Sequence, residues 1–339
     1  MNFGNSAGRH SVTKNDGALL ASAQQGDQHA FTQLIVGFRG ELHAHCYRML
    51  GSVHDADDAL QEVMLRAWQG LSGFEGRSSL RSWLYRLATN ACLTMIGQRA
   101  KRVLPVDLTP AAEVGESLAE PISEPLWLEP YPDPDTQVEQ RESIELAFVA
   151  AVQHLSGNER AALLLREVIG FSAREVAELV DASVPAVNSA LQRARRIVND
   201  HIESRAPRSG ARSITDARLR GIVDNYIDAL ERGDVDAMVA LLTDDVTWSM
   251  PPIPTWYRGR AAVTQFLIDA PMQVRWRHRI TAANGQPAVA CYMWDSDQQA
   301  YAAEVLDVLT MRDDRIAAVT AFMDATLFPR FGLPEALPA

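Results

Sequence analysis

The first two hundred residues place their apolar side chains at helical spacing. One stripe comprises Leu60, Val63, Met64, Ala67 and Leu71, and its period of three to four residues predicts an amphipathic helix. Asp55 followed by Asp58 predicts the N-terminus of this helix, because carboxylates cap free amide groups and favour the positive end of the helix dipole. Further helical patterns cover 79–96 and 139–203, with a break at 156–159. We therefore expect this part of the chain to be α-helical.

Beyond residue 214 the pattern changes from helical spacing to short apolar runs. Two helices are expected first, over 214–232 and 235–242, with Gly233 between them. Five strand-like runs follow, separated by turns rich in Gly, Asp and Asn; they cover 245–250, 273–283, 288–294, 303–313 and 315–323. Helices followed by several short strands predict a separate α+β domain.

Negative charge is concentrated between the two helical stretches. The whole chain carries a net charge of −11, and residues 104–145 hold eleven acidic side chains against one base, Arg141. The same residues include seven prolines, which exclude a regular helix or central strand over most of this range. This pattern predicts an acidic linker that runs into the next helix. The acidity therefore belongs mainly to a tether, and the rest of the chain is near neutral.

The predicted organisation is multi-domain, with three folded parts and two linkers. The expected bounds are 16–102 for the first helical domain, 103–138 for the acidic linker, 139–203 for the second helical domain, 204–213 for a short basic linker and 214–332 for the α+β domain. A chain of 339 residues accommodates three domains of ordinary size.

The cysteines and the apolar runs bear on the compartment. Cys46, Cys92 and Cys291 are far apart in the sequence, which predicts reduced thiols in a cytoplasmic protein. No apolar run has the length of a membrane span, and the polar N-terminus lacks the apolar core of a secretion signal, so no membrane association is expected. His43, His45 and Cys46 invite a metal hypothesis, but on a helix residues 43 and 45 point apart, and we expect no metal site.

Residues 173–196 have the pattern of a helix-turn-helix. Asp181 falls at the turn, where aspartate tolerates the left-handed conformation, and Pro185 fits the first turn of the second helix. The side chains expected to face DNA are Ser183, which is also a good N-cap, Ala186, Asn188, Ser189, Gln192, Arg193 and Arg196. Amide and hydroxyl groups read base edges, and arginines hold phosphates. The pattern alone also fits a helical hairpin with a solvated basic face.

Two long motifs resemble one protein family. The stretch LSGNERAALLLREVIGFSAREVAELVDASVPAVNSALQRARRIV (155–198) closely resembles the C-terminal DNA-binding domain of bacterial sigma factors of the extracytoplasmic-function (ECF) class, within the sigma-70 family. Independently, DADDALQEVMLRAWQGLSGFEGRSSLRSWLYRLATNACL (55–93) resembles the sigma domain that binds core RNA polymerase and the −10 promoter element. The resemblance implies a sigma factor that directs promoter-specific transcription initiation, without enzymatic activity or cofactor. The alternative is a helix-turn-helix regulator that acts without core polymerase.

The resemblance implies partners for the first helical domain. The coiled coil of the largest polymerase subunit would dock on Asp55, Asp57, Asp58, Gln61, Glu62 and Leu65. A solvated acidic helix face is the alternative for these residues. The second helical domain would contact the −35 element and the flap of the second-largest subunit.

The −10 contact is expected between Phe74 and Arg102, where cations alternate with aromatic residues. Cations suit phosphates and aromatic faces suit unstacked bases. The expected residues are Phe74, Arg77, Ser78, Arg81, Trp83, Arg86 and Asn90. Trp83 and Tyr85 are alternatively core residues.

Several positions depart from the family pattern. Thr94 and Gln98 replace an acid and a base that many relatives carry, which leaves the −10 sequence preference open. Asp181 replaces a common turn glycine, and Asn188 and Ala190 stand where relatives often carry lysine and arginine. Fewer cations predict a weaker or differently specified −35 contact.

Within the acidic linker, Trp127 and Tyr131 are bulky side chains in a stretch otherwise too polar to be buried. They are expected to anchor the linker, because some sigma factors with a C-terminal extension carry a similar linker motif that docks on it. Loose packing on the nearest domain is the alternative.

Residues 214–331 resemble the SnoaL-like cone fold, in which a bent sheet surrounds a pocket. The resemblance implies pocket candidates at Trp248, Trp256, Tyr257, His278 and Asp324. We expect this domain to regulate the sigma domains. The alternative is a catalytic module, or one that senses a small-molecule ligand, since pockets of this fold in enzymes hold a general acid or base.

Overall fold

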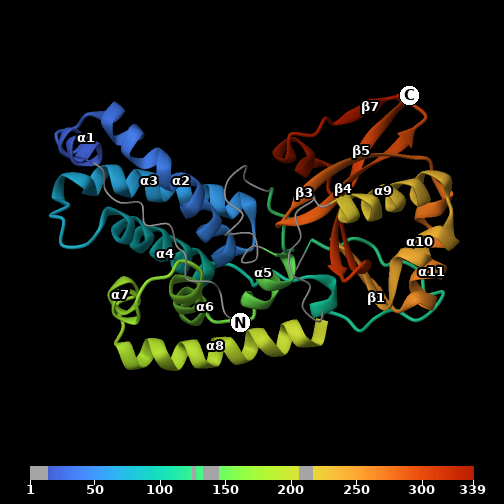
Figure 1. Ribbon diagram of the computed structural model, residues 1–339, viewed down its shortest axis with the longest axis horizontal. Coiled ribbons are helices and arrows are strands. Elements are labelled where there is room, and N and C mark those ends of the chain that lie inside the picture. Colours follow the sequence, from blue (N-terminus) through green and yellow to red (C-terminus); the bar gives the residue numbers. More distant parts are fainter. Residues whose placement is uncertain (1–13, 124–126, 133–144, 206–216) are drawn as a thin grey trace. The chain divides into compact units, whose positions relative to one another are not determined.

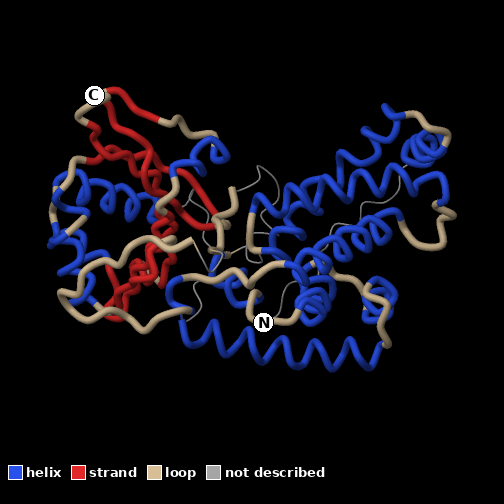
Figure 2. Tube along the Cα trace, turned by 180° about the vertical axis from the view of Figure 1, so that it is seen from behind, coloured by secondary structure: helices blue, strands red, loops and turns tan. Residues whose placement is uncertain are grey.

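The computed structural model describes residues 14–123, 127–132, 145–205 and 217–339. These residues divide into two compact units. Unit 1 lies within Met1–Lys101 and Phe148–His201, and unit 2 lies within Arg102–Ala147 and Ile202–Ala339. Unit 1 is helical, and the strands gather in unit 2 (Figure 1; Figure 2). The described part of the acidic linker therefore belongs to the same unit as the C-terminal sheet.

The first helical module of unit 1 is a four-helix arrangement. It consists of α1 (Lys14–Gln24), α2 (Gln28–Leu50), α3 (Val53–Gly70), a 3-10 turn η1 (Leu71–Gly73) and α4 (Leu80–Gln98). Helix α2 packs against the other three helices. The predicted apolar stripe is confirmed for Leu60, Val63, Ala67 and Leu71, which are buried, while Met64 is half-buried.

The start of α3 differs from the sequence prediction. Ser52, rather than Asp55, is the N-cap, and its hydroxyl accepts a hydrogen bond from the Asp55 amide over 3.1 Å. Asp55 lies in the first turn, where it is buried and forms an ion pair with Arg99. The prediction of Asp55 as the cap was therefore wrong by one turn, because serine is also a preferred N-cap residue and Asp55 lies three residues further on.

The second helical module consists of short helices and one long helix. Its elements are α5 (Leu146–Val152), α6 (Gly157–Leu163), a π-helical turn η4 (Leu164–Val168), α7 (Ala173–Leu179) and α8 (Val184–Arg205). The helix-turn-helix prediction is confirmed at its turn, because Asp181 adopts a φ of 51°. Ser183 accepts a hydrogen bond from the Ala186 amide over 3.3 Å, as expected of an N-cap.

The two helical modules pack against each other within unit 1. The buried guanidinium of Arg160 donates to the carbonyl oxygen of Met49 at the end of α2 and to the side chain of Gln153. Gln153 in turn donates to the Arg48 carbonyl over 3.1 Å. The rings of Tyr85 and Phe171 meet edge to face with their centroids 5.4 Å apart.

In the described part of unit 2, seven strands form one sheet. The strands are β1 (Leu242–Met250), β2 (Ile253–Arg258), β3 (Trp276–Ala283), β4 (Gln286–Asp295), β5 (Ala300–Arg312), β6 (Arg315–Phe322) and β7 (Ala336–Pro338). Their order is β2-β1-β6-β5-β4-β3, with β7 paired to β5. Only the β1–β6 pair is parallel among these strands. Three helices accompany the sheet: α9 (Ala217–Arg232), α10 (Val235–Leu241) and α11 (Arg260–Asp269).

The sheet domain buries one continuous core between its helices and strands. Helix α9 packs against β3 and β4, and α11 packs against β1 and β2. The core includes Tyr226 of α9, Trp248 of β1 and Phe266 of α11. Short 3-10 segments complete unit 2: η2 (Pro105–Asp107), η5 (Pro271–Gln273) and η6 (Ala325–Phe331). None of the helices in the described ranges has the length and hydropathy of a membrane span.

Candidate functional sites

Helix α3 presents most of the residues expected to meet the polymerase on one exposed face. Asp57, Asp58 and Gln61 are exposed, and Leu65 has 51 % of its surface exposed. Glu62 is half-buried and forms an ion pair with Arg66 over 2.6 Å. The face is therefore acidic with an apolar residue at one end. Asp55 does not belong to it, since it is buried and paired with Arg99.

The residues expected to bind the −10 element fall into a loop and one helix face. Arg77 and Ser78 are exposed in the loop before α4, and Arg86 and Asn90 are exposed on α4 itself. Trp83 lies on the same face of α4, because it precedes Arg86 by three residues and Asn90 by seven. Trp83 is half-buried and packs against Phe74, with ring centroids 5.2 Å apart. Tyr85, in contrast, is fully buried in the core.

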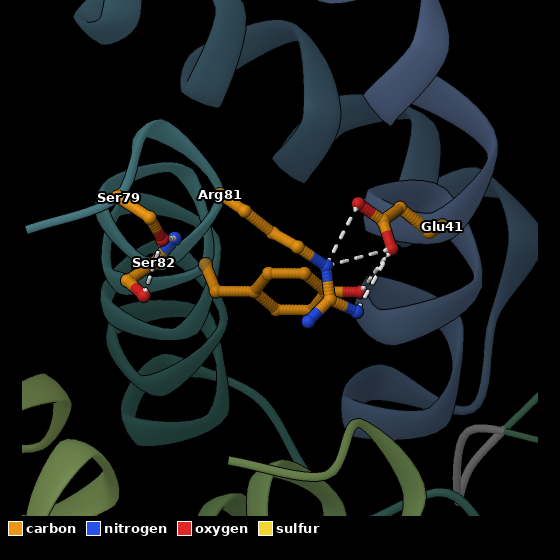
Figure 3. Close-up of polar contacts among 5 residues, drawn as sticks. Glu41, Ser79, Arg81 and Ser82 are labelled. Atoms are coloured by element: carbon orange, nitrogen blue, oxygen red, sulfur yellow. Dashed lines mark hydrogen bonds and ion pairs between the residues drawn. The ribbon is translucent and has the colours of Figure 1, made fainter. Parts of the chain in front are cut away.

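Arg81 does not join this group, because it points across to α2. Its Nη2 donates to Glu41 Oε2 over 3.0 Å, and its Nε lies 3.2 Å from the same oxygen (Figure 3). The guanidinium also lies over the ring of Phe171, 5.3 Å from its centroid. The sequence predicts that Arg81 contacts DNA, but in this structure its guanidinium is already bound by Glu41 and by the second helical module.

The helix-turn-helix exposes its predicted DNA-facing side chains together. Ser183, Ala186, Asn188, Ser189, Gln192, Arg193 and Arg196 are all exposed along the turn and α8. Arg193 forms an ion pair with Glu159 over 2.7 Å. The hydrogen bond from Arg193 lowers the pKa of Glu159 below its usual value, although partial burial of the carboxylate opposes this shift. Ala190 is buried at 9 % exposure, so its methyl group packs inward.

The two aromatic residues of the linker have different partners. Tyr131 is buried and exchanges two hydrogen bonds with Asn284, each 2.8 Å long: its amide donates to Asn284 Oδ1, and its carbonyl accepts from the Asn284 amide. Trp127 is half-buried and donates from Nε1 to the Ile122 carbonyl, 2.8 Å away in the linker itself. The linker also buries Leu128, although we expected the residues around Trp127 and Tyr131 to be too polar for burial.

The described linker lies along β2, the edge strand of the sheet. The Ala112 amide donates to the Trp256 carbonyl over 2.8 Å, and the Ala119 amide donates to Thr255 Oγ1 over 2.9 Å. Side chains of β2 return the contact: Trp256 Nε1 donates to the Thr109 carbonyl over 2.8 Å. These bonds use polar groups that an edge strand would otherwise leave to solvent or to another chain.

A cavity of about 310 Å³ opens in the sheet domain. Trp248 and His278 line it, as the sequence predicts for pocket residues. Trp256 and Tyr257 instead hold the linker, the Tyr257 hydroxyl donating to the Glu116 carbonyl over 2.9 Å. Asp324 caps η6, where its carboxylate accepts from the amide and hydroxyl of Thr326.

The sequence interpretation missed Asp307, which also lines the cavity. Burial raises the pKa of Asp307 to about 6, although hydrogen bonds from Tyr226 and Cys291 oppose the shift. Tyr226 donates to Oδ2 over 2.8 Å, and Cys291 Sγ lies 3.3 Å from the same oxygen. The sequence held a signal for it: by strand alternation, Asp307 shares a face with Val305 and Leu309, both core residues.

The histidines pair with groups other than a metal. His278 Nδ1 lies 3.2 Å from Glu231 Oε1, and burial lowers the pKa of His278 despite this carboxylate. His43 pairs with Asp57, and His45 pairs with Thr89. Among the residues that the structure describes, no group of three or more His, Cys, Asp or Glu could hold a metal ion. All three cysteines are free and buried.

Comparison with known proteins accounts for each folded part. Residues 34–102 match the model of sigma-70 region 2, residues 145–198 match sigma-70 region 4, and residues 223–319 match the SnoaL-like domain. The ECF RNA polymerase sigma factor SigG of Mycobacterium tuberculosis is 45 % identical over 337 residues, covering 96 % of this chain and 89 % of that protein.

Two further comparisons differ in their coverage. The ECF sigma-E factor of Escherichia coli is 28 % identical over 188 residues, which cover 56 % of this chain and 94 % of that protein. The crystal structure of the Mycobacterium tuberculosis ECF sigma factor SigJ superposes with a TM-score of 0.57 at 21 % identity, covering 89 % of this chain and 99 % of that one. This superposition supports a shared fold.

Two sigma domains followed by a SnoaL-like domain define a transcription initiation factor with a fused accessory domain. The chain belongs to the ECF RNA polymerase sigma factors. It therefore binds core RNA polymerase and promoter DNA, and its helix-turn-helix is the DNA-binding part of region 4. Sigma factors as a family are not enzymes.

Proposed function

We propose that the exposed face of α3 docks on the coiled coil of the largest polymerase subunit. Asp58, Gln61 and Glu62 supply polar and acidic groups, and Leu65 supplies an apolar contact. An acidic patch attracts and orients a basic partner. Asp57 contributes charge at the rim, while the buried Asp55 supports the helix start. The second helical module meets the flap of the second-largest subunit.

We propose that promoter DNA contacts both helical modules. The loop and helix face that carry Arg77, Trp83, Arg86 and Asn90 bind the −10 element, with arginines on phosphates and aromatic rings on unstacked bases. The exposed residues of α8 enter the major groove at the −35 element. Polymerase and chromosome meet in the bacterial cytoplasm, and the protein acts there.

The two helical modules pack against each other in a closed state. They must separate if they are to contact both promoter elements at once. Promoter elements centred about 25 base pairs apart lie roughly 80 Å apart on a duplex that rises about 3.4 Å per base pair. A compact unit of the size of unit 1 has a radius of gyration of only about 15 Å. Unit 1 as described therefore cannot span both elements, and Arg81, held by Glu41 and Phe171, must be released to contact DNA.

We propose that the SnoaL-like domain regulates this opening through the linker. The observation that supports the proposal is the series of hydrogen bonds between the linker and β2, because the linker joins the two modules that must separate. A second role is supported by the cavity: sensing of a small molecule, since a mostly apolar concave pocket with a few polar groups is the usual form of a ligand site.

A charge reversal tests the polymerase contact. Glu62→Lys should weaken binding of core polymerase at least tenfold, because it places a cation opposite a basic partner. The matched control is Asp224→Lys on the exposed side of α9, which should bind core polymerase as the parent chain does. Unchanged binding by Glu62→Lys in a core-polymerase pull-down would show that the assignment is wrong. A parent chain that bound promoter DNA but not core polymerase would instead support the regulator hypothesis.

Run-off transcription tests the regulatory role. The full-length chain and a chain ending at Pro207 are compared on a cognate promoter with core polymerase. Loss of the SnoaL-like domain removes the strand on which the linker docks, so transcription should differ severalfold between the two chains. Equal transcription at matched concentrations would exclude a regulatory role, and turnover of a small molecule by the full-length chain would indicate an enzyme.

A further inference from the structure

The cavity of the SnoaL-like domain has the properties of a regulated ligand site. We propose that it binds a small, largely apolar molecule that carries a hydrogen-bond donor, and that the bound molecule strengthens docking of the linker on β2 through Leu118. This inference rests on the linker-based regulation proposed above, and it names the ligand chemistry and the contact that connects ligand to linker.

The walls of the cavity select an apolar molecule. Aromatic and thioether side chains dominate them, including Trp248, Phe266, Trp276, Met293 and Met323. The volume of about 310 Å³ is at the lower end of small-molecule sites. Trp276 is fixed by a hydrogen bond from its Nε1 to the Pro271 carbonyl over 2.7 Å, so this wall is preformed.

Two buried side chains that line the cavity, His278 and Asp307, each offer a hydrogen-bond acceptor. His278 places Nδ1 toward Glu231, which favours the tautomer with the proton on Nδ1 and leaves Nε2 as an acceptor. The His278 side chain is 0 % exposed, and Nε2 has no hydrogen-bond partner among the described residues. Asp307 accepts both of its described hydrogen bonds on Oδ2, so Oδ1 remains available.

Both acceptors can be satisfied by a hydrogen-bond donor on the ligand. A buried polar group without a partner costs free energy, and a donor on the ligand removes that cost. Because Asp307 has a pKa of about 6, its carboxylate is largely ionised at neutral pH and accepts strongly. The ligand class is therefore an apolar ring system or chain that carries a hydroxyl or N–H group.

Leu118 connects this site to the linker. It lines the cavity from the linker side, and 38 % of its surface is exposed. Two hydrogen bonds to β2 flank it, from the Tyr257 hydroxyl to the Glu116 carbonyl and from the Ala119 amide to Thr255 Oγ1. A ligand in the cavity adds apolar contact to Leu118 and thereby favours the docked linker, while the docked linker covers the ligand.

Calorimetric titration of the full-length chain with β-naphthol and with its methyl ether tests the ligand chemistry. The two probes share the apolar rings, but only β-naphthol has a donor. We expect saturable binding of β-naphthol at one site, about tenfold tighter than the ether, as one hydrogen bond to a buried acceptor would give. Absence of saturable β-naphthol binding, or equal affinity for the two probes, would overturn the proposal.

Two variants locate the binding. Asp307→Asn places an amide where the free acceptor was, so it should abolish the preference for β-naphthol over the ether. If the cavity collapsed, both affinities would fall together, and His278→Phe then repeats the test by removing Nε2 while keeping a ring. A preference that survives both substitutions would overturn the proposal.

Linker coupling is tested with Leu118→Ser and its control Val114→Ser, an apolar linker residue that is 60 % exposed. Bound β-naphthol should slow hydrogen exchange of the Ala112, Ala119 and Ile122 amides in the parent chain and in Val114→Ser, and Leu118→Ser should lose this effect. Unchanged exchange on binding would overturn the coupling. These measurements need no polymerase, so their failure is distinct from equal transcription by the full-length and shortened chains.

Discussion

At the scale of single residues, Asp307 is a carboxylate in the place of an aliphatic core residue. It is 4 % exposed and lies between Val305 and Leu309 on the inner face of β5. Burying a charge is costly, and the fold compensates only partly through the hydrogen bonds from Tyr226 and Cys291. A domain selected for stability alone would place an apolar side chain here, so this residue supports a ligand-binding role.

The raised pKa of Asp307 gives a pH-dependent stability. The folded pKa of about 6 exceeds the ordinary value of 3.8, so the folded domain binds a proton between these values and loses stability as the pH rises through that window. Asp307→Asn does not titrate. Its unfolding free energy relative to the parent chain should therefore improve by up to about 3 kcal/mol between pH 4 and pH 7. A difference in unfolding free energy between the two chains that stays the same from pH 4 to pH 7 would contradict the prediction.

Sequence spacing predicted the exposure of single residues well where one helix determines it. The exposure predicted for the side chains of α8 is confirmed, because helical periodicity alone determines which side of a helix is buried; their contact with DNA stays a prediction. Arg81 shows where this reasoning ends: its spacing from Arg77 and Trp83 says nothing of Glu41, forty residues earlier, which binds it. Asp307 and Glu231 likewise acquire their roles from partners on other elements.

At the scale of elements, the turn of the helix-turn-helix carries backbone strain at Asp181. A φ of 51° is unfavourable for residues with a side chain, least so for Asp and Asn. Asp181→Val should destabilise the second module by about 1–2 kcal/mol, because a β-branched side chain fits this conformation poorly.

Asp181→Gly is the matched comparison for that turn. Relief of the strain and the greater freedom of glycine in the unfolded chain nearly cancel, so its stability should stay within about 0.5 kcal/mol of the parent chain. Thermal melting of the three chains measures both effects. Equal melting of the valine and glycine variants would show that this turn is unstrained.

The linker contact with β2 is open to a similar pairwise comparison. Tyr257→Phe removes the hydroxyl that donates to Glu116, so protease cleavage in the linker and exchange of the Ala119 amide should rise severalfold. Tyr292→Phe is the control, because the Tyr292 hydroxyl is buried without a hydrogen-bond partner among the described residues. Faster exchange in both variants would point to general loosening of the domain instead.

Strand β2 also shows why part of the fold escaped the sequence prediction. The five predicted strands match β1, β3, β4, β5 and β6, but β2 lies within a proline-rich stretch, with Pro254 inside it. Proline is compatible with a strand only at an edge, and edge position is a property of the whole sheet. Helix α11 and strand β7 were missed as well, since their patterns are short.

At the scale of the whole molecule, the packing of the two helical modules is the contact that must open in the function proposed above. Energy transfer between dyes reports it. The three native cysteines are buried, so dyes attach to introduced pairs such as Gln33→Cys on α2 with Glu178→Cys on α7. Transfer should be high in the free chain and fall severalfold when core polymerase and promoter DNA are added, because the two promoter elements lie far apart.

The control pair lies within one module. Gln33→Cys with Gln98→Cys joins two exposed positions of the first helical module, and its transfer should not change on binding. If the first pair kept its transfer in the complex, the modules would contact DNA without separating, and the closed state would have no regulatory meaning.

The linker on β2 has a further consequence in terms of polymer statistics. Release of the described linker residues 102–123 from β2 would add to the tether between the two modules a segment with a root-mean-square span of roughly 25 Å and a fully extended reach of roughly 75 Å. In the function proposed above, this added length lets region 4 reach the −35 element while region 2 holds the −10 element, at an effective concentration of about a millimolar. Docking withdraws chain from the tether and lowers that concentration, so the occupancy of β2 sets how readily the second DNA contact follows the first.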